Sequence, residues 1–224
     1  MPFTLRFDAV LFDLDGTLLL SEKDLIASVR HALAAVDHRE PPDDDTIIME
    51  VGKPLETILR ELQYPAGPDE AKLFADTYRE HFARTFGTHT KLAPLCLEVL
   101  DALGEAGVKR AVVTTKHQAQ ADFVVGKMGL APRLELVRGW QEGRKHKPDP
   151  EPFLEAAAAL GVARDRALVV GDTEQDIGAA KDGGLTCCAV TWGFRPILLL
   201  KSLRPDYIIS QLRDVLSIAA TPTG

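Results

Sequence analysis

The strongest constraint on the fold is an alternation of short apolar segments and helical patterns that begins near residue 94. The segments KRAVVT at 109–114 and ALVVG at 167–171 are each followed by apolar residues at helical spacing. Apolar strands separated by helices are typical of a parallel sheet covered on both faces. The sequence therefore predicts an α/β fold with a doubly wound parallel sheet. Further strands are expected at 134–138, 186–191 and 207–209, and helices at 95–106, 117–127, 150–160 and 174–182.

A strand is also expected near the start of the chain, where residues 10–12 form the apolar run Val-Leu-Phe. Alone it would leave its backbone groups unpaired, so we expect it to join the same sheet. Between this run and residue 88 only helical patterns occur. We therefore expect an α/β core made of 1–19 and 88–224, with an all-helical cap at 20–87 inserted after the first strand. The cap helices are expected at 22–37, 43–50, 54–63 and 68–86.

Two local features complete this prediction. Ser21 and Asp24 have the spacing of a capping box at the start of the first cap helix. The polar tail from about residue 220 is expected to be unstructured.

The composition argues against two classes of partner. With 26 Lys and Arg against 33 Asp and Glu, the net charge of −7 gives no basic field for a nucleic acid or an anionic membrane. The three cysteines lack C-x-x-C spacing and fit reduced thiols of a cytoplasmic protein. No basic and apolar leader opens the chain, and no apolar run approaches the roughly 20 residues of a membrane span. We expect a cytoplasmic protein; the sequence leaves its oligomeric state open.

Acidic, hydroxyl and basic side chains follow the predicted strands where each strand ends. Ligands of open parallel sheets bind outside the carboxyl ends of the strands, so these side chains are expected to meet at one edge. They are Asp13 and Asp15 after the first strand, Thr114, Thr115 and Lys116 at the second, Lys147 after the third, and Asp172 and Asp176 after the fourth.

Several carboxylates at one edge would raise each other's pKa unless a cation neutralises them. Oxygen ligands of this kind, with room for water, suit Mg²⁺. The cation and Lys147 would attract an anion, which we interpret as a phosphoryl group. Alternate residues of an extended segment point the same way, so Asp13 can act as metal ligand and nucleophile while Asp15 handles the proton. This pattern predicts two-step transfer through an aspartyl-phosphate.

In several segments the chain resembles the haloacid dehalogenase superfamily, and within it the phosphoglycolate-phosphatase-type members with a helical cap. The resemblance covers essentially the whole core, whereas the cap matches mainly in position and helicity. It implies a Rossmann-like core and a Mg²⁺-dependent phosphatase that acts on a small phosphorylated metabolite. The matching segments are FDLDGTL at 12–18, VVTTK at 112–116, KPDPEPF at 147–153, VGDTEQDIGAAKDGG at 170–184 and VTWGF at 190–194.

Carried over residue by residue, the resemblance implies a complete site. Asp13 would be the nucleophile, and Asp15 the general acid and base. The metal would be held by Asp13, Asp172 and the backbone of Asp15. The phosphate binders would be Thr114, Thr115 and Lys147, and the supporting residues Asp176, Gly16 and Gly171.

The chain departs from the family pattern at two places. Leu19-Leu20-Ser21 stands where many members have a small residue followed by an acid, and Thr115 stands where an Asn is common. The first departure bears on substrate choice, and the second is mild because the amide is expected to meet the phosphate. In the cap, the loop VGKPLE at 51–56 is either an ordinary turn or a substrate loop in which Gly52 and Lys53 meet the non-reacting end of the substrate.

Other functions remain open alongside the phosphatase. A phosphomutase would use the same aspartyl-phosphate, and a metal-dependent binding protein would have lost a catalytic group, although none is missing here. Haloacid dehalogenation is disfavoured because that chemistry needs no metal and the resembling dehalogenases lack the second acid, Asp15. Three basic residues receive no ligand role: Lys116 is interpreted as a solvated or supporting charge, His146 as exposed, and Arg195 as able to reach a phosphate without being required.

Overall fold

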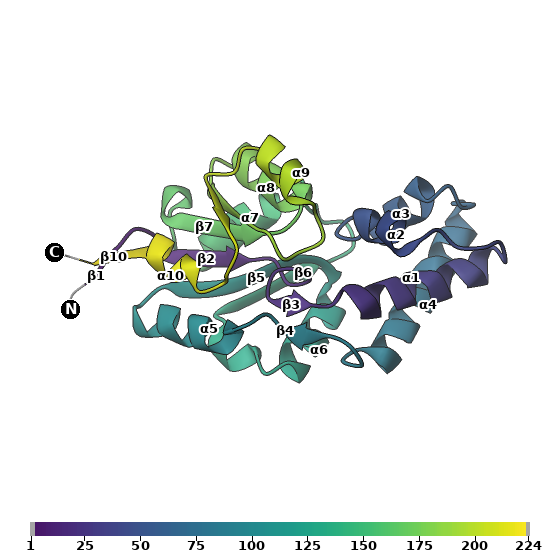
Figure 1. Ribbon diagram of the computed structural model, residues 1–224, viewed down its shortest axis with the longest axis horizontal. Coiled ribbons are helices and arrows are strands. Elements are labelled where there is room, and N and C mark those ends of the chain that lie inside the picture. The colour runs from purple at the N-terminus through teal and green to yellow at the C-terminus, as the bar shows by residue number, and fades with distance from the viewer. Residues whose placement is uncertain (1–2, 223–224) are drawn as a thin grey trace. The chain divides into compact units, whose positions relative to one another are not determined.

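The fold is built on a six-stranded, fully parallel sheet, seen in the computed structural model, which describes residues 3–222 (Figure 1). The strand order is β6-β5-β2-β7-β8-β9. The chain begins in the middle of the sheet, winds outward through β5 and β6, and then returns to wind the other way through β7, β8 and β9. The predicted α/β fold is therefore confirmed. The strands are β2 (Ala9–Phe12), β5 (Lys109–His117), β6 (Leu136–Trp140), β7 (Ala167–Gly171), β8 (Thr186–Val190) and β9 (Tyr207–Ile209).

The register of the sheet brings the ends of its central strands level. Phe12 of β2 pairs with Val112 of β5 on one side and with Val170 of β7 on the other. The direction of winding reverses between β2 and β7, and such a switch point is where open α/β sheets bind ligands. Asp13 and Asp172 follow the two strands that flank this point.

Helices cover both faces of the sheet because β2, β5 and β7 carry apolar side chains on both (Figure 1). On one face, Leu11 and Val169 pack with Phe153 and Ile177, all at most 1% exposed. Burial of each such side chain contributes about 1.5–3 kcal/mol. This face is covered by α7 (Glu151–Ala159) and α8 (Glu174–Asp182), and the other by α5 (Cys96–Glu105) and α6 (Gln118–Lys127).

Besides the six-stranded sheet and its helices, the α/β part of the chain contains a pair of strands that the sequence analysis missed. The strand β1 (Phe3–Leu5) pairs antiparallel with β10 (Ala220–Pro222). The prediction of an unstructured tail from about 220 is thus wrong for 220–222, while 223 and 224 lie outside the described residues. The segments FTL and ATP contain no apolar run, so only their pairing reveals these two strands. The same part contains the short helices α9 (Ile197–Ser202) and α10 (Asp214–Ala219) and the 3-10 turns η1 (Ala131–Arg133) and η2 (Arg164–Arg166).

The described residues up to Leu19 and from Leu92 onward form one compact unit, the sheet unit. Residues Leu20–Lys91 form a second compact unit, the helical unit. Where the chain passes between the units, β3 (Leu19–Leu20) pairs with β4 (Lys91–Leu92). Within the second unit, α1 packs against α4, and Leu33, Phe74 and Phe82 are fully buried. Across the described residues, no helix has both the length and the apolar character to cross a bilayer. The helices of this unit are α1 (Glu22–Val36), α2 (Asp44–Glu50), α3 (Leu55–Glu61) and α4 (Pro68–Thr85).

Asp24 does not form the predicted capping box. The Ser21 side chain makes no capping hydrogen bond. The Asp24 carboxylate instead accepts hydrogen bonds from the backbone N–H groups of Gly87, His89 and Thr90 at 3.0–3.1 Å and from the Thr90 hydroxyl at 2.7 Å. Burial acts to raise the pKa of Asp24, but these hydrogen bonds outweigh it and leave the pKa lowered. The capping-box spacing is present in the sequence, but the Asp24 carboxylate is hydrogen-bonded to a segment more than 60 residues away in the chain.

Candidate active site

Lys147 joins two of the predicted acids in one buried cluster. Its Nζ donates to Asp13 Oδ1 at 2.5 Å, to Asp176 Oδ1 at 2.6 Å and to the carbonyl of Val113 at 3.0 Å. Asp13 is fixed in turn because its backbone N–H donates to the carbonyl of Val170 at 2.8 Å. The structure therefore brings together Asp13, Lys147 and Asp176, which the sequence placed at the ends of three different strands.

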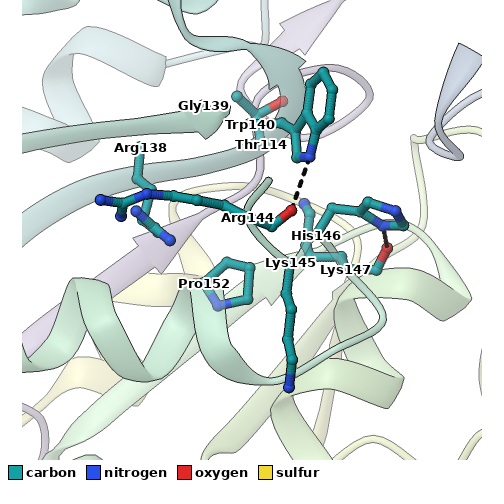
Figure 2. A pocket seen from close by; sticks show the side chains of 9 residues that line it. All are labelled: Thr114, Arg138, Gly139, Trp140, Arg144, Lys145, His146, Lys147 and Pro152. Atoms are coloured by element: carbon teal, nitrogen blue, oxygen red, sulfur yellow. Dashed lines mark hydrogen bonds between the residues drawn. The ribbon is translucent and has the colours of Figure 1, made fainter. Parts of the chain in front are cut away.

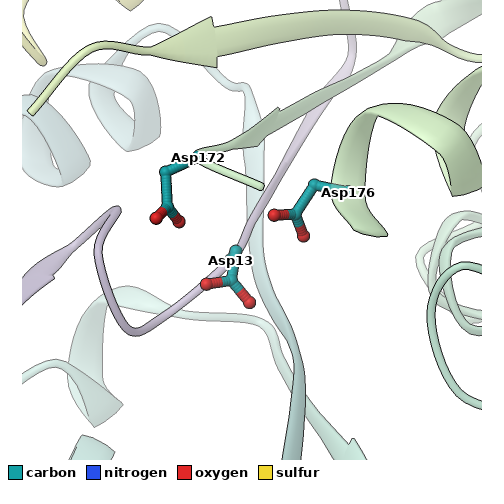
Figure 3. Close-up of side chains that lie close together, drawn as sticks. All are labelled: Asp13, Asp172 and Asp176. Atoms are coloured by element: carbon teal, nitrogen blue, oxygen red, sulfur yellow. The ribbon is translucent and has the colours of Figure 1, made fainter. Parts of the chain in front are cut away.

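Asp172 completes a group of three buried aspartates (Figure 3). One carboxylate oxygen from each of Asp13, Asp172 and Asp176 lies within 4.8 Å of the others. Burial, chiefly, raises the pKa of Asp13 to about 7, against the opposing charge of Lys147. Burial and the neighbouring aspartates also raise the pKa of Asp172 well above its usual value.

The charges of this cluster do not balance. When all three are ionised, the carboxylates around the single ammonium group carry two excess negative charges in a buried space, in keeping with the raised pKa values of Asp13 and Asp172. A divalent cation would neutralise them, and a set of carboxylate oxygens matches the donors that hard cations prefer. The residues present therefore fit a divalent metal ion.

The orientation of Asp172 is set by hydrogen bonds to both of its oxygens. The Thr17 hydroxyl donates to Oδ1 at 3.0 Å, and the backbone N–H of Phe194 donates to Oδ2 at 2.8 Å. Gly16, at φ +83°, and Gly193 lie so close that a Cβ would meet Asp172 atoms at 2.3 and 2.2 Å respectively. Only glycine allows the backbone to approach the carboxylate this closely.

Asp176 is used by protein donors on both oxygens. Its Oδ1 accepts from Lys147, while Oδ2 accepts from the Thr173 N–H at 3.1 Å and hydroxyl at 2.7 Å. The latter two bonds belong to the start of α8, where Thr173 and Asp176 form a capping box. A Cβ on Gly171 would lie 2.4 Å from the Asp176 Cβ, so this helix start packs directly on the end of β7. Asp176 thus links the helix to Lys147.

Asp15 is paired with Lys116, which fits the second of the two readings of Lys116, a supporting charge, and not the first, a solvated one. Lys116 Nζ lies 3.0 Å from Asp15 Oδ2, and the two side chains are 4% and 13% exposed. The strand β5 continues to His117, with a register irregularity against β6 after Val113. The sequence shows only that Lys116 lies near the end of β5 and that Asp15 follows β2, so both belong to the same edge of the sheet; no local pattern marks them as partners.

The predicted phosphate-binding hydroxyls behave differently from each other. Thr114 is buried, and its Oγ1 accepts a hydrogen bond from the N–H of Lys116 at 3.2 Å. Thr115 is half-buried. Thr114 and Lys147 also line a pocket on the sheet unit that the sequence analysis missed (Figure 2). The other lining residues are Arg138, Gly139, Trp140, Arg144, Lys145, His146 and Pro152.

Residues that line this pocket are held in place by contacts with one another. The Trp140 indole N–H donates to the carbonyl of Arg144 at 3.0 Å, and His146 Nδ1 lies 2.8 Å from the carbonyl of Lys147 (Figure 2). His146 is half-buried, so its interpretation as an exposed residue is wrong. These contacts fix the segment that carries Lys147.

The cap-loop residues lie in the second unit. Lys53 Nζ pairs with Glu50 Oε2 at 2.5 Å, and both side chains are about four-fifths buried. Gly52 has φ +101°, in the left-handed region that favours glycine. The loop is therefore an ordered turn, and its contact with a substrate stays a prediction.

Comparison with known proteins identifies the family. The model of the haloacid dehalogenase-like hydrolase family matches residues 10–190. The N-acetylmuramic acid 6-phosphate phosphatase of Pseudomonas aeruginosa is 32% identical over 85% of this chain and 84% of its own length. The pyrophosphatase PpaX of Halalkalibacterium halodurans is 29% identical over 96% and 97%.

A solved structure agrees in both fold and extent. It is described as a predicted phosphoglycolate phosphatase from Haemophilus somnus, superposes with a TM-score of 0.84 at 27% identity, and covers 95% of this chain and 98% of its own. The family match spans most of the chain, from the strand that precedes Asp13 to the end of β8. The protein therefore belongs to the haloacid dehalogenase-like hydrolase family.

Proposed function

We propose that the protein is a Mg²⁺-dependent phosphatase that hydrolyses a small phosphorylated metabolite through an aspartyl-phosphate on Asp13. The observation that carries this proposal is the position of Asp13. It stands at the switch point of the sheet, with Lys147 at 2.5 Å, in a buried cluster of three carboxylates and one ammonium group whose full ionisation needs a further cation. The phosphatases among its relatives support the same reaction class.

The metal would be held by the carboxylates of Asp13 and Asp172 and by the backbone carbonyl of Asp15. When bound, it would neutralise the buried carboxylates and offset the charge of the phosphoryl oxygens. Asp176 is a supporting residue rather than a ligand in this proposal, because Lys147 and Thr173 already occupy its oxygens.

In the first step, an oxygen of the Asp13 carboxylate attacks phosphorus and the bond to the leaving oxygen breaks. Asp15 donates a proton to that oxygen. In the second step, Asp15 takes a proton from water, which attacks the phosphorus of the aspartyl-phosphate and regenerates Asp13. Lys147 orients Asp13 and, with Thr114 and the amide of Thr115, binds the phosphoryl oxygens, while Lys116 orients Asp15.

The decisive experiment replaces Asp13 with Asn and measures phosphate release from p-nitrophenyl phosphate with Mg²⁺. Turnover should disappear, because an amide cannot serve as the nucleophile. The matched control is Asp8→Asn: Asp8 immediately precedes the same strand, at the other end, and pairs with Arg166. The control should keep parental turnover. Hydrolysis by the Asp13→Asn variant at near parental rates would show that another group is the nucleophile.

The relatives differ in the substrates that their names give. Their names cover pyrophosphate, an amino-sugar phosphate and phosphoglycolate, which share a phosphoryl end and little else. We propose that the helical unit acts as a cap that excludes water and selects among such compounds, with Gly52 and Lys53 at the non-reacting end. A panel of these phosphates, assayed for free phosphate and for isomerised sugar phosphate, would identify the substrate and separate a phosphatase from a phosphomutase.

A further inference from the structure

The segment Trp192–Arg195, which follows β8, surrounds Asp172 on two sides. The backbone N–H of Phe194 donates to Asp172 Oδ2 at 2.8 Å. On the other side, the Trp192 indole N–H donates to the carbonyl of Thr17 at 3.1 Å, and the Thr17 hydroxyl donates to Asp172 Oδ1 at 3.0 Å. Both oxygens of Asp172 therefore depend on where this segment lies.

The segment is itself anchored by a buried ion pair. Arg195 Nε lies 2.6 Å from Glu174 Oε2, and its other guanidinium nitrogen, Nη2, lies 3.0 Å from Glu174 Oε1. The Arg195 side chain is 0% exposed, whereas that of Glu174 is 28% exposed. Burial acts to raise the pKa of Glu174, but the guanidinium outweighs it and leaves the pKa lowered. Such two-point pairing restricts both partners more than a single contact does.

These contacts and the backbone between them form a closed loop that contains Asp172. Glu174 stands two residues after Asp172, and Arg195 stands one residue after Phe194, so the ion pair and the Phe194 hydrogen bond connect the same two segments. Rotation of the Asp172 carboxylate would require this closed loop to open. The close approach of Gly193, where a Cβ would lie 2.2 Å from the Asp172 Cβ, leaves the segment no room to shift inward.

We infer that Arg195 and Glu174 are positioning residues that hold Asp172 in the orientation needed to bind the divalent cation. This inference rests on the proposed function. Neither residue touches the substrate; they act through the Phe194 amide and the Asp172 carboxylate. Partners that orient a metal ligand commonly change metal affinity by about 10- to 100-fold when they are replaced. The same range is expected here.

The test measures Mg²⁺ binding directly, with Trp192 as the reporter. The chain has two tryptophans, so Trp140→Phe leaves Trp192 as the single tryptophan fluorophore, and this variant is the reference for all titrations. In that background, Arg195→Gln and Glu174→Gln should each weaken Mg²⁺ binding by about 10- to 100-fold, in fluorescence titration and in calorimetry. At saturating Mg²⁺, kcat should return to within a few fold of the reference.

Two further variants separate positioning from general stability. Arg195→Lys keeps the charge but loses the two-point geometry, so it should bind Mg²⁺ with an affinity between those of the reference and Arg195→Gln. Arg166→Gln removes another two-point pair of the sheet unit, with Asp8, at the opposite end of β7 from Asp172; the hydrogen bonds described for Asp172 come from Thr17 and Phe194. This control should leave Mg²⁺ affinity unchanged. The double variant of Arg195 and Glu174 should bind Mg²⁺ no more weakly than the worse single variant, because either single substitution already breaks the one ion pair.

The outcomes distinguish the inference from the proposal on which it rests. If the unmodified protein binds no Mg²⁺ in calorimetry, the proposed function fails. If the reference binds Mg²⁺ and folded Glu174→Gln and Arg195→Lys proteins bind it equally well, the positioning role fails while the proposed function stands. A loss of kcat that high Mg²⁺ does not restore would also contradict the positioning role.

Discussion

The ammonium group of Lys147 lies 2.5 Å from Asp13 Oδ1 although the two residues are 134 positions apart in the chain. Burial by itself would lower the pKa of this lysine, but the charges of Asp13 and Asp176 outweigh it and leave the pKa raised. The raised pKa favours the protonated form of Lys147, which therefore supplies a positive charge to the site.

Replacing Lys147 with Met should damage both stability and turnover. Removing one partner of a buried charge cluster leaves the others uncompensated and costs about 3–5 kcal/mol. Urea unfolding in the presence of a chelator should show this loss, and kcat should fall at least about 100-fold. Lys201→Met, at an exposed position of α9, is the control and should change neither quantity appreciably. Parental kcat in the Lys147→Met variant would remove Lys147 from the site.

Mg²⁺ should stabilise the protein, and more so at high pH than at low pH. With the pKa of Asp13 raised to about 7 by burial, the folded state holds this proton more tightly than the unfolded state. In the metal-free protein this contribution to stability is therefore complete below the unfolded pKa of about 3.9 and is lost as pH rises through about 7.

The measurement is thermal unfolding with MgCl₂ or a chelator at pH 5 and pH 8. Mg²⁺ competes with the proton for Asp13, so the rise in Tm should be larger at pH 8; a ligand at 100 times its Kd adds about 2.7 kcal/mol. Asp172→Asn should remove most of the shift at both pH values. An equal shift at the two pH values would contradict the assignment of Asp13 as a metal ligand.

Gly193→Ala should impair the site because of its contact with Asp172. The new methyl group would lie 2.2 Å from the Asp172 Cβ, so one of the two backbones must move. We expect kcat/KM to fall at least about tenfold and stability to fall by about 1–3 kcal/mol. Gly126→Ala is the matched control: it lies in α6 with open space around the added Cβ, and helix propensity predicts a slight gain in stability.

Asp24→Asn should destabilise the helical unit without changing the chemistry of the sheet unit. The substitution removes the charge that accepts hydrogen bonds from Gly87, His89 and Thr90, and it turns an amide toward backbone donors. Leaving buried donors unsatisfied costs about 1–3 kcal/mol, which urea unfolding at pH 7 would detect. Glu22→Gln, an exposed acid in the same first turn, should cost far less.

The lowered pKa of Asp24 also gives this contribution a defined pH dependence. Because the folded pKa lies below the unfolded one, the stability is present above about pH 4 and is lost as pH falls through the folded pKa. The difference in stability between parent and Asp24→Asn should therefore shrink on acidification. A constant difference down to about pH 2 would contradict the role of the ionised carboxylate.

Elements with strong local signals were predicted closely. The strand β7 at 167–171, the helix α8 at 174–182 and the strand β9 at 207–209 agree with the structure to the residue. Each has an apolar run or helical period bounded by clear turn residues. The short strands β1 and β10 were missed because, unlike β9 with its sequence YII, they contain no apolar run, and their pairing joins opposite ends of the chain.

Only part of the candidate site could be predicted from the sequence. Asp13, Lys147, Asp172 and Asp176 do meet, as the ends of parallel strands must. The assignment of charges to partners was not foreseen: Lys116 pairs with Asp15, and Arg195, which had no assigned role, pairs with Glu174. Asp24 looked like a local cap and instead binds the segment at Gly87–Thr90.

The sequence by itself determined where the strands and helices of the α/β core follow one another along the chain, and which kinds of side chain come after each strand. It could do so because periodicity and turn residues act over a few neighbouring positions. Only the tertiary structure decided which charges neutralise one another and which buried carboxylates are left with excess charge. The energy of a buried charge depends on distances across the fold and on exclusion of water. Asp13 and Lys147, 134 residues apart, have no local pattern that encodes the 2.5 Å between them.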